Sequence, residues 1–273
     1  MMKIYLKNVL KMLNKIKILV VGKNSFISLN YKKFSKFKNK IKIVSHKNVL
    51  KLKLDKFSHI FNLSIDPKIK SKQYKFTNKI DEKICKKIKN KNIIYIFPST
   101  RFIYEKKQKN NFYRLNKIII ENKIKKLIRQ NYLILRIGNI LAFDLNNKSL
   151  FVTKMLNDLK NKNEIRFDLK KNTQKDFITF DYFAKCLDIL IEKKIVGTYN
   201  FSSGKKTSIN MVANSIIKGY GKGKIIFEKN LKNDSFVLNN SDLKRIVKLN
   251  LYKKDIQKYC FKIGQNLRKF KKI

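Results

Sequence analysis

Four side chains in the middle of the chain have the types and spacing of an acid/base site: Thr100, Tyr104, Tyr113 and Lys117. They lie in the segment IIYIFPSTRFIYEKKQKNNFYRLNK, where a strand-like run ends in a hydroxyl residue and a helix-like run follows. A helix would place Tyr113 and Lys117 on one face, because they are four residues apart. A phenol beside an ammonium group can exchange a proton with a substrate oxygen.

The Tyr-x-x-x-Lys spacing has little weight by itself. The chain contains 59 Lys and 12 Tyr among its 273 residues, so about two or three matches are expected by chance. Two are present, and they start at Tyr113 and Tyr220. The elements that surround each match must therefore decide whether it can do chemistry.

The N-terminal half alternates apolar, β-branched runs with amphipathic runs. Strands are predicted over residues 16–21, 41–44, 59–63, 93–97 and 132–137, and helices over 26–37, 76–89 and 112–129. Strands of this type separated by helices are typical of βαβ units, in which both faces of a parallel sheet are covered. The fold class is therefore predicted to be α/β, with a doubly wound, Rossmann-like parallel sheet.

The second half is less regular. Helices are predicted over 150–159, 182–192 and 209–217, short strands over 198–201 and 224–227, and two basic amphipathic helices after residue 241. We divide the chain into an N-terminal extension (1–15), a dinucleotide-binding domain (16–145) and a smaller α/β substrate-binding lobe (146–273) interleaved with it. Met12 is an alternative start of translation.

Composition restricts the classes of function. The formal charge of +48 comes almost wholly from Lys, with seven Arg, and it is spread along the chain without a basic stripe or tail. Lysines on solvated faces explain this, although nonspecific nucleic-acid binding is expected at low salt. Three dispersed Cys fit a reducing compartment and hence the cytoplasm. With two His, a metal site is not expected, and no apolar run is long enough to span a membrane.

The first strand runs into a turn with the spacing of a phosphate-binding loop. Gly22, Ser25 and Ser28 stand at the three positions of a G-x-x-G-x-x-G pattern, before a helix whose N-terminus could hold a pyrophosphate. Candidate cofactor-binding residues of this turn are Gly22, Ser25, Phe26 and Ile27. At the end of the second strand, Ser45 and Lys47 occur without a carboxylate. A dinucleotide bound there could be NADP or NAD, and NADP is slightly favoured.

Seven segments, in order, resemble the extended short-chain dehydrogenase/reductase family, often called NAD-dependent epimerase/dehydratases, whose members mostly act on nucleotide sugars. The resemblance covers residues 16–251. The segments are KILVVGKNSFIS, HIFNLSIDP, IIYIFPSTRFIY, FYRLNKIIIE, LILRIGNILA, QKDFITFDYFAKCLDIL and GTYNFSSGKKTSINMVANSI. This order gives weight to the match at Tyr113 and leaves the match at Tyr220 as a coincidence.

The resemblance implies a role for each matching residue. Tyr113 is the acid/base group, Lys117 supplies a positive charge that lowers the phenol pKa and also holds the nicotinamide ribose, and Thr100 orients the reacting oxygen. Leu63 and Ser64 line the cofactor. Expected substrate-binding residues are Ser99, Asn139 and Lys175.

The resemblance also narrows the reaction to a nucleotide-sugar reductase or epimerase that uses NAD(P). Arg101 and Phe102 follow Thr100, where 4,6-dehydratases have Asp-Glu, so dehydration is disfavoured. Reduction of a 4-keto sugar stands slightly ahead of 4-epimerisation. A noncatalytic dinucleotide-binding or RNA-binding protein of the same fold is the alternative. A homodimer is an expectation from the resemblance alone.

Overall fold

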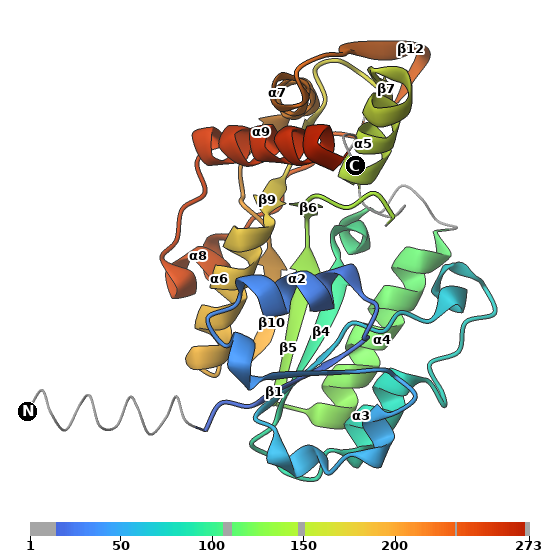
Figure 1. Ribbon diagram of the computed structural model, residues 1–273. Coiled ribbons are helices and arrows are strands. Elements are labelled where there is room, and N and C mark those ends of the chain that lie inside the picture. The colour runs from blue at the N-terminus through green and yellow to red at the C-terminus, as the bar shows by residue number, and fades with distance from the viewer. Residues whose placement is uncertain (1–14, 106–110, 147–150, 233, 271–273) are drawn as a thin grey trace, which may run out of the picture. The chain divides into compact units, whose positions relative to one another are not determined.

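The computed structural model describes residues 15–105, 111–146, 151–232 and 234–270 (Figure 1). The predicted N-terminal extension, with Met12, lies almost wholly outside the described residues, as does residue 150, the predicted start of a helix. The chain forms two compact units. Unit 1 runs to Ile137 and includes Ala184–Tyr199, whereas unit 2 comprises Gly138–Phe183 and the residues from Asn200 onward.

Unit 1 is organised around a six-stranded sheet with the strand order β10-β5-β4-β3-β1-β2. The pairs β1–β2, β1–β3, β3–β4 and β4–β5 are parallel. The strands are β1 (Ile18–Val21), β2 (Ile41–Val44), β3 (His59–Asn62), β4 (Ile94–Thr100), β5 (Tyr132–Ile137) and β10 (Gly197–Phe201). All four residues of β1 and of β3 are buried, as expected when helices cover both faces of a parallel sheet. The predicted doubly wound α/β class is confirmed.

Helices cover the two faces of this sheet in different ways. On one face, α3 (Ile80–Lys87) and α4 (Phe112–Ile128) share a core with the strands, in which Ile84 and Ile124 join Ile60. On the other, Tyr31 of α2 (Phe26–Phe34) meets Phe61 edge-on, with ring centroids 6.2 Å apart. Because Ile60 and Phe61 are consecutive, they point to opposite faces. Short 3-10 turns lie at Lys38–Lys40, Val49–Lys51, Leu54–Lys56, Pro67–Lys70 and Arg101–Tyr104.

Unit 2 combines three small two-stranded sheets with helices. β7 (Glu164–Leu169) pairs with β12 (Lys224–Lys232), β6 (Asn139–Leu141) with β9 (Phe177–Thr179), and β8 (Gln174–Lys175) with β11 (Thr207–Ser208). The helices are α5 (Phe151–Lys162), α7 (Ile209–Tyr220), α8 (Ser241–Val247) and α9 (Lys253–Phe270), and α6 (Phe180–Glu192) continues from unit 2 into unit 1. The two basic helices predicted after residue 241 are confirmed.

Two helices of unit 1 are shorter than their hydrophobic patterns predict. The helix predicted over 26–37 is α2, which ends at Phe34 because Ser35 turns to extended backbone and its hydroxyl donates to Asp188. The helix predicted from residue 76 begins at Ile80, since Asn78 has a left-handed φ of 63°. Both ends depend on backbone conformations that apolar periodicity does not encode.

Asp188 on α6 anchors the end of α2 through three donors. Its carboxylate accepts hydrogen bonds from the Tyr31 hydroxyl (2.7 Å), the Ser35 hydroxyl (2.6 Å) and the Lys36 N–H (2.7 Å). We expect Asp188→Ala to lower the free energy of unfolding by about 2–3 kcal/mol, because these donors lose their acceptor. Urea unfolding followed by circular dichroism measures this change.

Glu192 supplies the matched control for Asp188. It lies one turn further along α6 and pairs with Lys36 at 2.5 Å, but both side chains are substantially exposed. Glu192→Ala should therefore cost less than about 1 kcal/mol. Equal losses for the two variants would contradict the anchoring role of Asp188.

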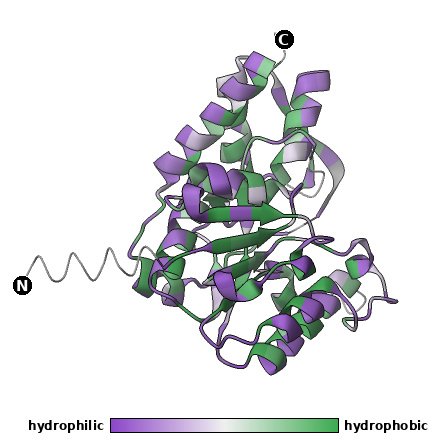
Figure 2. Ribbon diagram, turned by 60° about the horizontal axis from the view of Figure 1, so that its bottom comes forward, coloured by the Kyte–Doolittle hydropathy of each residue, from purple (hydrophilic) through white to green (hydrophobic). Residues whose placement is uncertain are grey.

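The lysines are distributed very unevenly between surface and interior. Figure 2 shows apolar strands inside and hydrophilic residues along the outer sides of the helices. Among the described residues, Lys117 and Lys175 are the two lysines in the buried class. Both were predicted as site residues.

No helix in the described part of the chain is long and apolar enough to cross a membrane.

Candidate functional site

The turn after β1 requires a glycine. Gly22 has a φ of +121°, and a Cβ added there would lie 3.0 Å from the carbonyl carbon of Leu63. Its N–H donates to Val44 O at 2.8 Å, while the Leu63 N–H donates to Val21 O at 2.7 Å. Gly22 therefore sits where the ends of β1, β2 and β3 meet, at the carboxyl edge at which doubly wound folds bind ligands.

The two serines of the turn fit without disrupting it. Ser28 is fully buried in α2, and its hydroxyl donates to the Gly22 carbonyl at 2.7 Å. Ser25 is the N-cap residue of α2, and its side chain makes no capping hydrogen bond. Ser25, Phe26 and Ile27 are all partly exposed around the helix N-terminus. The loss of two glycines thus leaves the predicted turn in place.

The ends of β2 and β3 place the remaining predicted cofactor residues. Ser45 is half-buried and begins a turn in which its carbonyl accepts from the Asn48 N–H at 3.1 Å, and Lys47 is exposed. Leu63 is buried. The N–H (3.1 Å) and hydroxyl (2.5 Å) of Ser64 both donate to the Asn62 side-chain oxygen.

Thr100, Tyr113 and Lys117 come together where β4 meets α4. Thr100, the last residue of β4, is buried, and its side chain lies close enough to Tyr113 to influence the phenol. The Lys117 ammonium donates to the Pro98 carbonyl at 2.7 Å. It lies 4.5 Å from the centre of the Phe97 ring and 5.8 Å from that of Tyr113. The predicted acid/base pair therefore shares one helix face beside the end of β4.

The pKa values of Tyr113 and Lys117 differ from the expectation that Lys117 lowers the phenol pKa. Burial raises the pKa of Tyr113 above its usual value, and the nearby Thr100 side chain opposes that rise. Burial lowers the pKa of Lys117 to about 8, against the attraction of Asp81 and Glu121. Lys117 does not depress the phenol pKa in this state, because its ammonium is directed at the Pro98 carbonyl and Tyr113 is itself desolvated.

Ser99 has a different environment from its neighbour Thr100. Its hydroxyl donates to the buried carboxylate of Glu121, which also pairs with Arg136 at 2.8 Å. Ser99 thus faces Glu121, further along α4, rather than Tyr113. Glu121 was not among the predicted site residues, although it follows Lys117 by four residues and that spacing places it on the same helix face.

The second Tyr-x-x-x-Lys match lacks this geometry. Tyr220 is the last residue of α7, and Lys224 begins β12 after a turn at Gly221. The two residues are therefore on different elements, and the structure confirms that this match is a coincidence.

Two predicted substrate-binding residues belong to unit 2. Asn139 begins β6, and its side-chain nitrogen is buried with no hydrogen-bond partner among the described residues. The buried Lys175 donates to the carboxylate of Asp234 and, at 2.9 Å, to its carbonyl. The Lys175 ammonium lies 5.4 Å from the ring centres of Phe151 and of Phe236. Lys175 is thus paired within unit 2, whereas Asn139 is a partly exposed residue whose buried nitrogen lacks the partner that such groups usually have.

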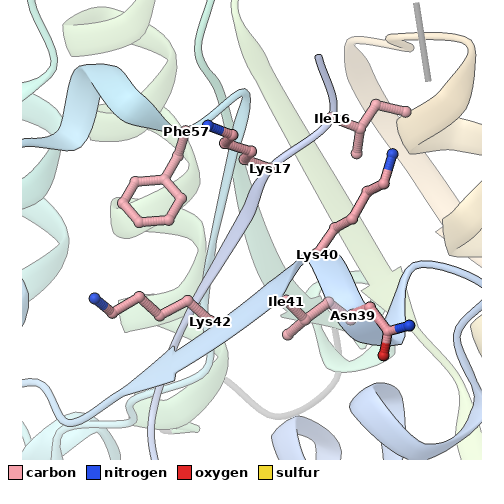
Figure 3. A pocket seen from close by; sticks show the side chains of 7 residues that line it. All are labelled: Ile16, Lys17, Asn39, Lys40, Ile41, Lys42 and Phe57. Atoms are coloured by element: carbon pink, nitrogen blue, oxygen red, sulfur yellow. The ribbon is translucent and has the colours of Figure 1, made fainter. Parts of the chain in front are cut away.

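A pocket of about 410 Å³ lies at the opposite edge of the unit 1 sheet (Figure 3). Ile16, Lys17 and Phe57 line it together with residues 39–42 at the start of β2. This is the amino edge of the strands, so none of the predicted site residues lines it. The pocket adds nothing to the chemistry at the carboxyl edge.

Comparison with solved structures identifies the fold. UDP-N-acetylglucosamine 4-epimerase from Methanobrevibacter ruminantium M1 is 17% identical, with a TM-score of 0.71 over 94% of this chain and 99% of that chain. A dTDP-4-dehydrorhamnose reductase from Clostridium acetobutylicum is 18% identical, with a TM-score of 0.69 over 89% and 98% of the two chains. The fold is that of the extended short-chain dehydrogenases/reductases.

A third structure of this fold differs in its reaction. The dTDP-glucose 4,6-dehydratase from Bacillus anthracis, solved in complex with NAD, is 14% identical, with a TM-score of 0.69 over 94% of this chain and 97% of that chain. The sequence matches no protein-family model and no curated protein. The short-chain dehydrogenase fold therefore rests on the structure, and at these identities it leaves the reaction open.

Proposed function

We propose that this protein is an NAD(P)-dependent enzyme that reduces or epimerises a nucleotide sugar at C4. The observation that carries the proposal is the arrangement of Thr100, Tyr113 and the buried Lys117 at the end of β4. A lysine buried among so many exposed ones needs a local reason, and cofactor binding beside an acid/base tyrosine supplies one. The related epimerases and reductase of the same fold support the choice of substrate class.

The residues at the carboxyl edge fit a dinucleotide. Gly22 leaves space that a Cβ would fill, and the N-terminus of α2 begins three residues later, where a pyrophosphate would meet helix N–H groups. Leu63 and Ser64 would lie along the cofactor, and Lys117 would hold the nicotinamide ribose. Bound there, the nicotinamide would accept or donate a hydride.

The chain's own residues supply the proton chemistry. Tyr113 has a raised pKa, so it is protonated at neutral pH and suited to give a proton to a carbonyl oxygen. In the reverse direction it must take a proton from a hydroxyl, for which the charge of Lys117 stabilises the phenolate. Thr100, whose side chain lies beside Tyr113, would orient the same oxygen.

The residues after Thr100 favour reduction or epimerisation over dehydration. Arg101 is buried and paired with Glu105 at 2.6 Å, and the Phe102 ring stands edge-on to Tyr113 with centroids 6.1 Å apart. Neither side chain is a carboxylic acid that could remove a proton beside a ketone. Of the two remaining reactions, we place 4-keto reduction slightly ahead.

Binding of a reduced cofactor is the direct test of this proposal. We expect NADH or NADPH to bind with a micromolar dissociation constant, measured by the change in nicotinamide fluorescence. Lys47→Ala should weaken NADPH binding about 10-fold more than NADH binding, because the exposed ammonium follows β2 where a 2'-phosphate would lie. Lys51→Ala, an exposed lysine in the next turn, is the matched control and should change neither.

The substrate is identified by assaying a panel of nucleotide sugars with the preferred cofactor. UDP-N-acetylglucosamine and UDP-glucuronic acid test epimerisation, and a dTDP-linked 4-keto sugar tests reduction. Failure of both NADH and NADPH to bind, at low as well as physiological salt, would refute the enzyme proposal. Low salt alone is insufficient, since a chain of +48 attracts any polyanion.

A further inference from the structure

A buried cluster of polar side chains lies beneath the catalytic site of unit 1. The Asp81 carboxylate, in the first turn of α3, accepts hydrogen bonds from the Asn62 amide nitrogen at 2.8 Å and the Tyr95 hydroxyl at 2.6 Å. Asn62 ends β3 and Tyr95 lies on β4, so three elements converge on one oxygen, Oδ1. Asn62, Asp81 and Tyr95 are 2%, 6% and 0% exposed. Burial raises the pKa of the Asp81 carboxyl above its usual value, and both donors oppose that rise by favouring the ionised form.

The orientation of Asn62 is determined by its other end. Its side-chain oxygen accepts from the N–H and hydroxyl of Ser64, so its nitrogen must face Asp81. The N-terminal position of Asp81 on α3 adds the favourable field of the helix dipole. Asp81 is thus held in one place from three directions, although an ionised carboxylate at this depth is costly without a cation.

Lys117 is the cation that offsets the charge of Asp81. Tyr95, which donates to Asp81, and Phe97, whose ring centre lies 4.5 Å from the Lys117 ammonium, are two residues apart on β4 and so point to the same face of the sheet. The Lys117 ammonium also donates to Pro98 O, and the Asp81 charge attracts it. Glu121 also attracts Lys117, but its carboxylate is already paired with Arg136. Asp81 is therefore the principal unshared counter-charge of Lys117.

We propose that Asp81 is a positioning residue of the catalytic site, whose buried carboxylate keeps Lys117 charged and in place behind Tyr113. This inference rests on the proposed function, because the site is catalytic only if the protein is an enzyme. The electrostatic pairing of Asp81 and Lys117 can be tested without a substrate. Neither its spacing nor the family resemblance draws attention to Asp81.

The pairing predicts a specific dependence of stability on pH. Lys117 has a pKa of about 8 in the folded protein, below the value of about 10.4 in an unfolded chain. Its burial therefore costs stability in full below pH 8, and the cost falls as the pH rises from about 8 to about 10.4. Removing the Asp81 charge lowers the folded pKa further. In the variant, stability therefore starts to rise with pH already below pH 8. In the wild type, Lys117 gives no such rise below pH 8.

Burial moves the pKa values of the tyrosines and the thiol around the pair upward, away from the pH range of the test. The Tyr113 pKa is raised on α4, and near Asp81 the pKa values of Tyr95, Tyr74 and Cys85 are all raised by burial. The Thr100 and Asn62 side chains carry no charge. Because burial also raises the pKa of the Asp81 carboxyl, a difference in slope between about pH 6.5 and 8 reports on Lys117 and Asp81 together.

The experiment compares Asp81→Asn with Asp188→Asn by urea unfolding between about pH 6.5 and 8. Each variant removes one buried carboxylate of unit 1 whose pKa burial raises, so the change in net charge is matched. The one acceptor oxygen of asparagine can keep both hydrogen bonds at position 81 and those from Tyr31 and Ser35 at position 188, while the bond from the Lys36 N–H is lost. The folding equilibrium constant of Asp81→Asn should rise up to about 10-fold per pH unit relative to Asp188→Asn. Equal slopes would overturn the inference.

A double variant keeps the test valid if Asp81→Asn does not fold. Lys117→Met leaves an unpaired carboxylate at Asp81, so Asp81→Asn/Lys117→Met should unfold at a higher urea midpoint than Lys117→Met alone. A lower midpoint for the double variant would overturn the pairing.

NADH titrations of the same proteins separate the two proposals. If the wild type binds no NADH but the slopes differ, the pairing stands and the proposed function fails. If the wild type binds NADH and the slopes are equal, the proposed function stands and the role of Asp81 fails.

Discussion

Tyr113→Phe is expected to bind NAD(P)H as tightly as the wild type and to lose turnover by about 10²- to 10⁴-fold. The phenol is the group that Thr100 contacts and the one oriented beside Lys117 on α4. Its removal takes away the proton donor and acceptor while leaving the ring and its edge-on contact with Phe102. Initial rates on the best substrate of the panel, at saturating cofactor, measure the loss.

Tyr220→Phe is the matched control for Tyr113→Phe. Tyr220 starts the second Tyr-x-x-x-Lys match, and its buried hydroxyl has no hydrogen-bond partner among the described residues. Deleting that hydroxyl should change neither turnover nor the unfolding midpoint. If Tyr113→Phe kept turnover within about threefold of the wild type, Tyr113 would not be the acid/base group.

Gly264→Ala is expected to destabilise unit 2 by about 3 kcal/mol or more. A Cβ at Gly264 on α9 would lie 2.0 Å from the Ile216 carbonyl oxygen, and a Cβ at Gly219 on α7 would lie 2.0 Å from the Phe261 carbonyl oxygen. The two helices therefore meet backbone to backbone, with one glycine from each. An added methyl group must push a helix away, because backbone oxygens cannot rotate aside as side chains do.

The helix contact is tested by urea unfolding of Gly219→Ala and Gly264→Ala. Gly138→Ala is the matched control, because a Cβ there would have its nearest neighbour, the Asp176 carbonyl oxygen, at an ordinary 3.5 Å. It should cost little. Stability of Gly264→Ala equal to that of Gly138→Ala would show that α7 and α9 do not meet this closely.

The local patterns of the chain predicted most of unit 1 and the core of its site. Apolar runs predicted the strands of the parallel sheet, because each buried strand needs a continuous apolar sequence, whereas their order in the sheet came from the structure. The turn at Gly22 and the pair Tyr113 and Lys117 were also found, since turns and helix faces depend on short-range spacing. Thr100 followed from the family resemblance.

Other features depended on contacts between distant segments. The strand β7 was not predicted, and it pairs with β12 about sixty residues later. Neither was the anchor of α2 at Asp188, which lies more than 150 residues beyond Ser35. A one-dimensional pattern carries no record of such partners, so hydrogen bonds of long sequence separation were invisible to it.

The sequence by itself determined that this is an α/β chain with a glycine turn after the first strand and a tyrosine and a lysine on one helix face, because those features depend on neighbours along the chain. Tertiary structure alone decided which lysines leave the solvent: of the many in the described residues, Lys117 and Lys175 are buried. It also decided that Asp81, Asn62 and Tyr95 meet at one oxygen beneath the site. The physical reason is that burial and charge pairing depend on packing between elements, which no spacing within a single element specifies.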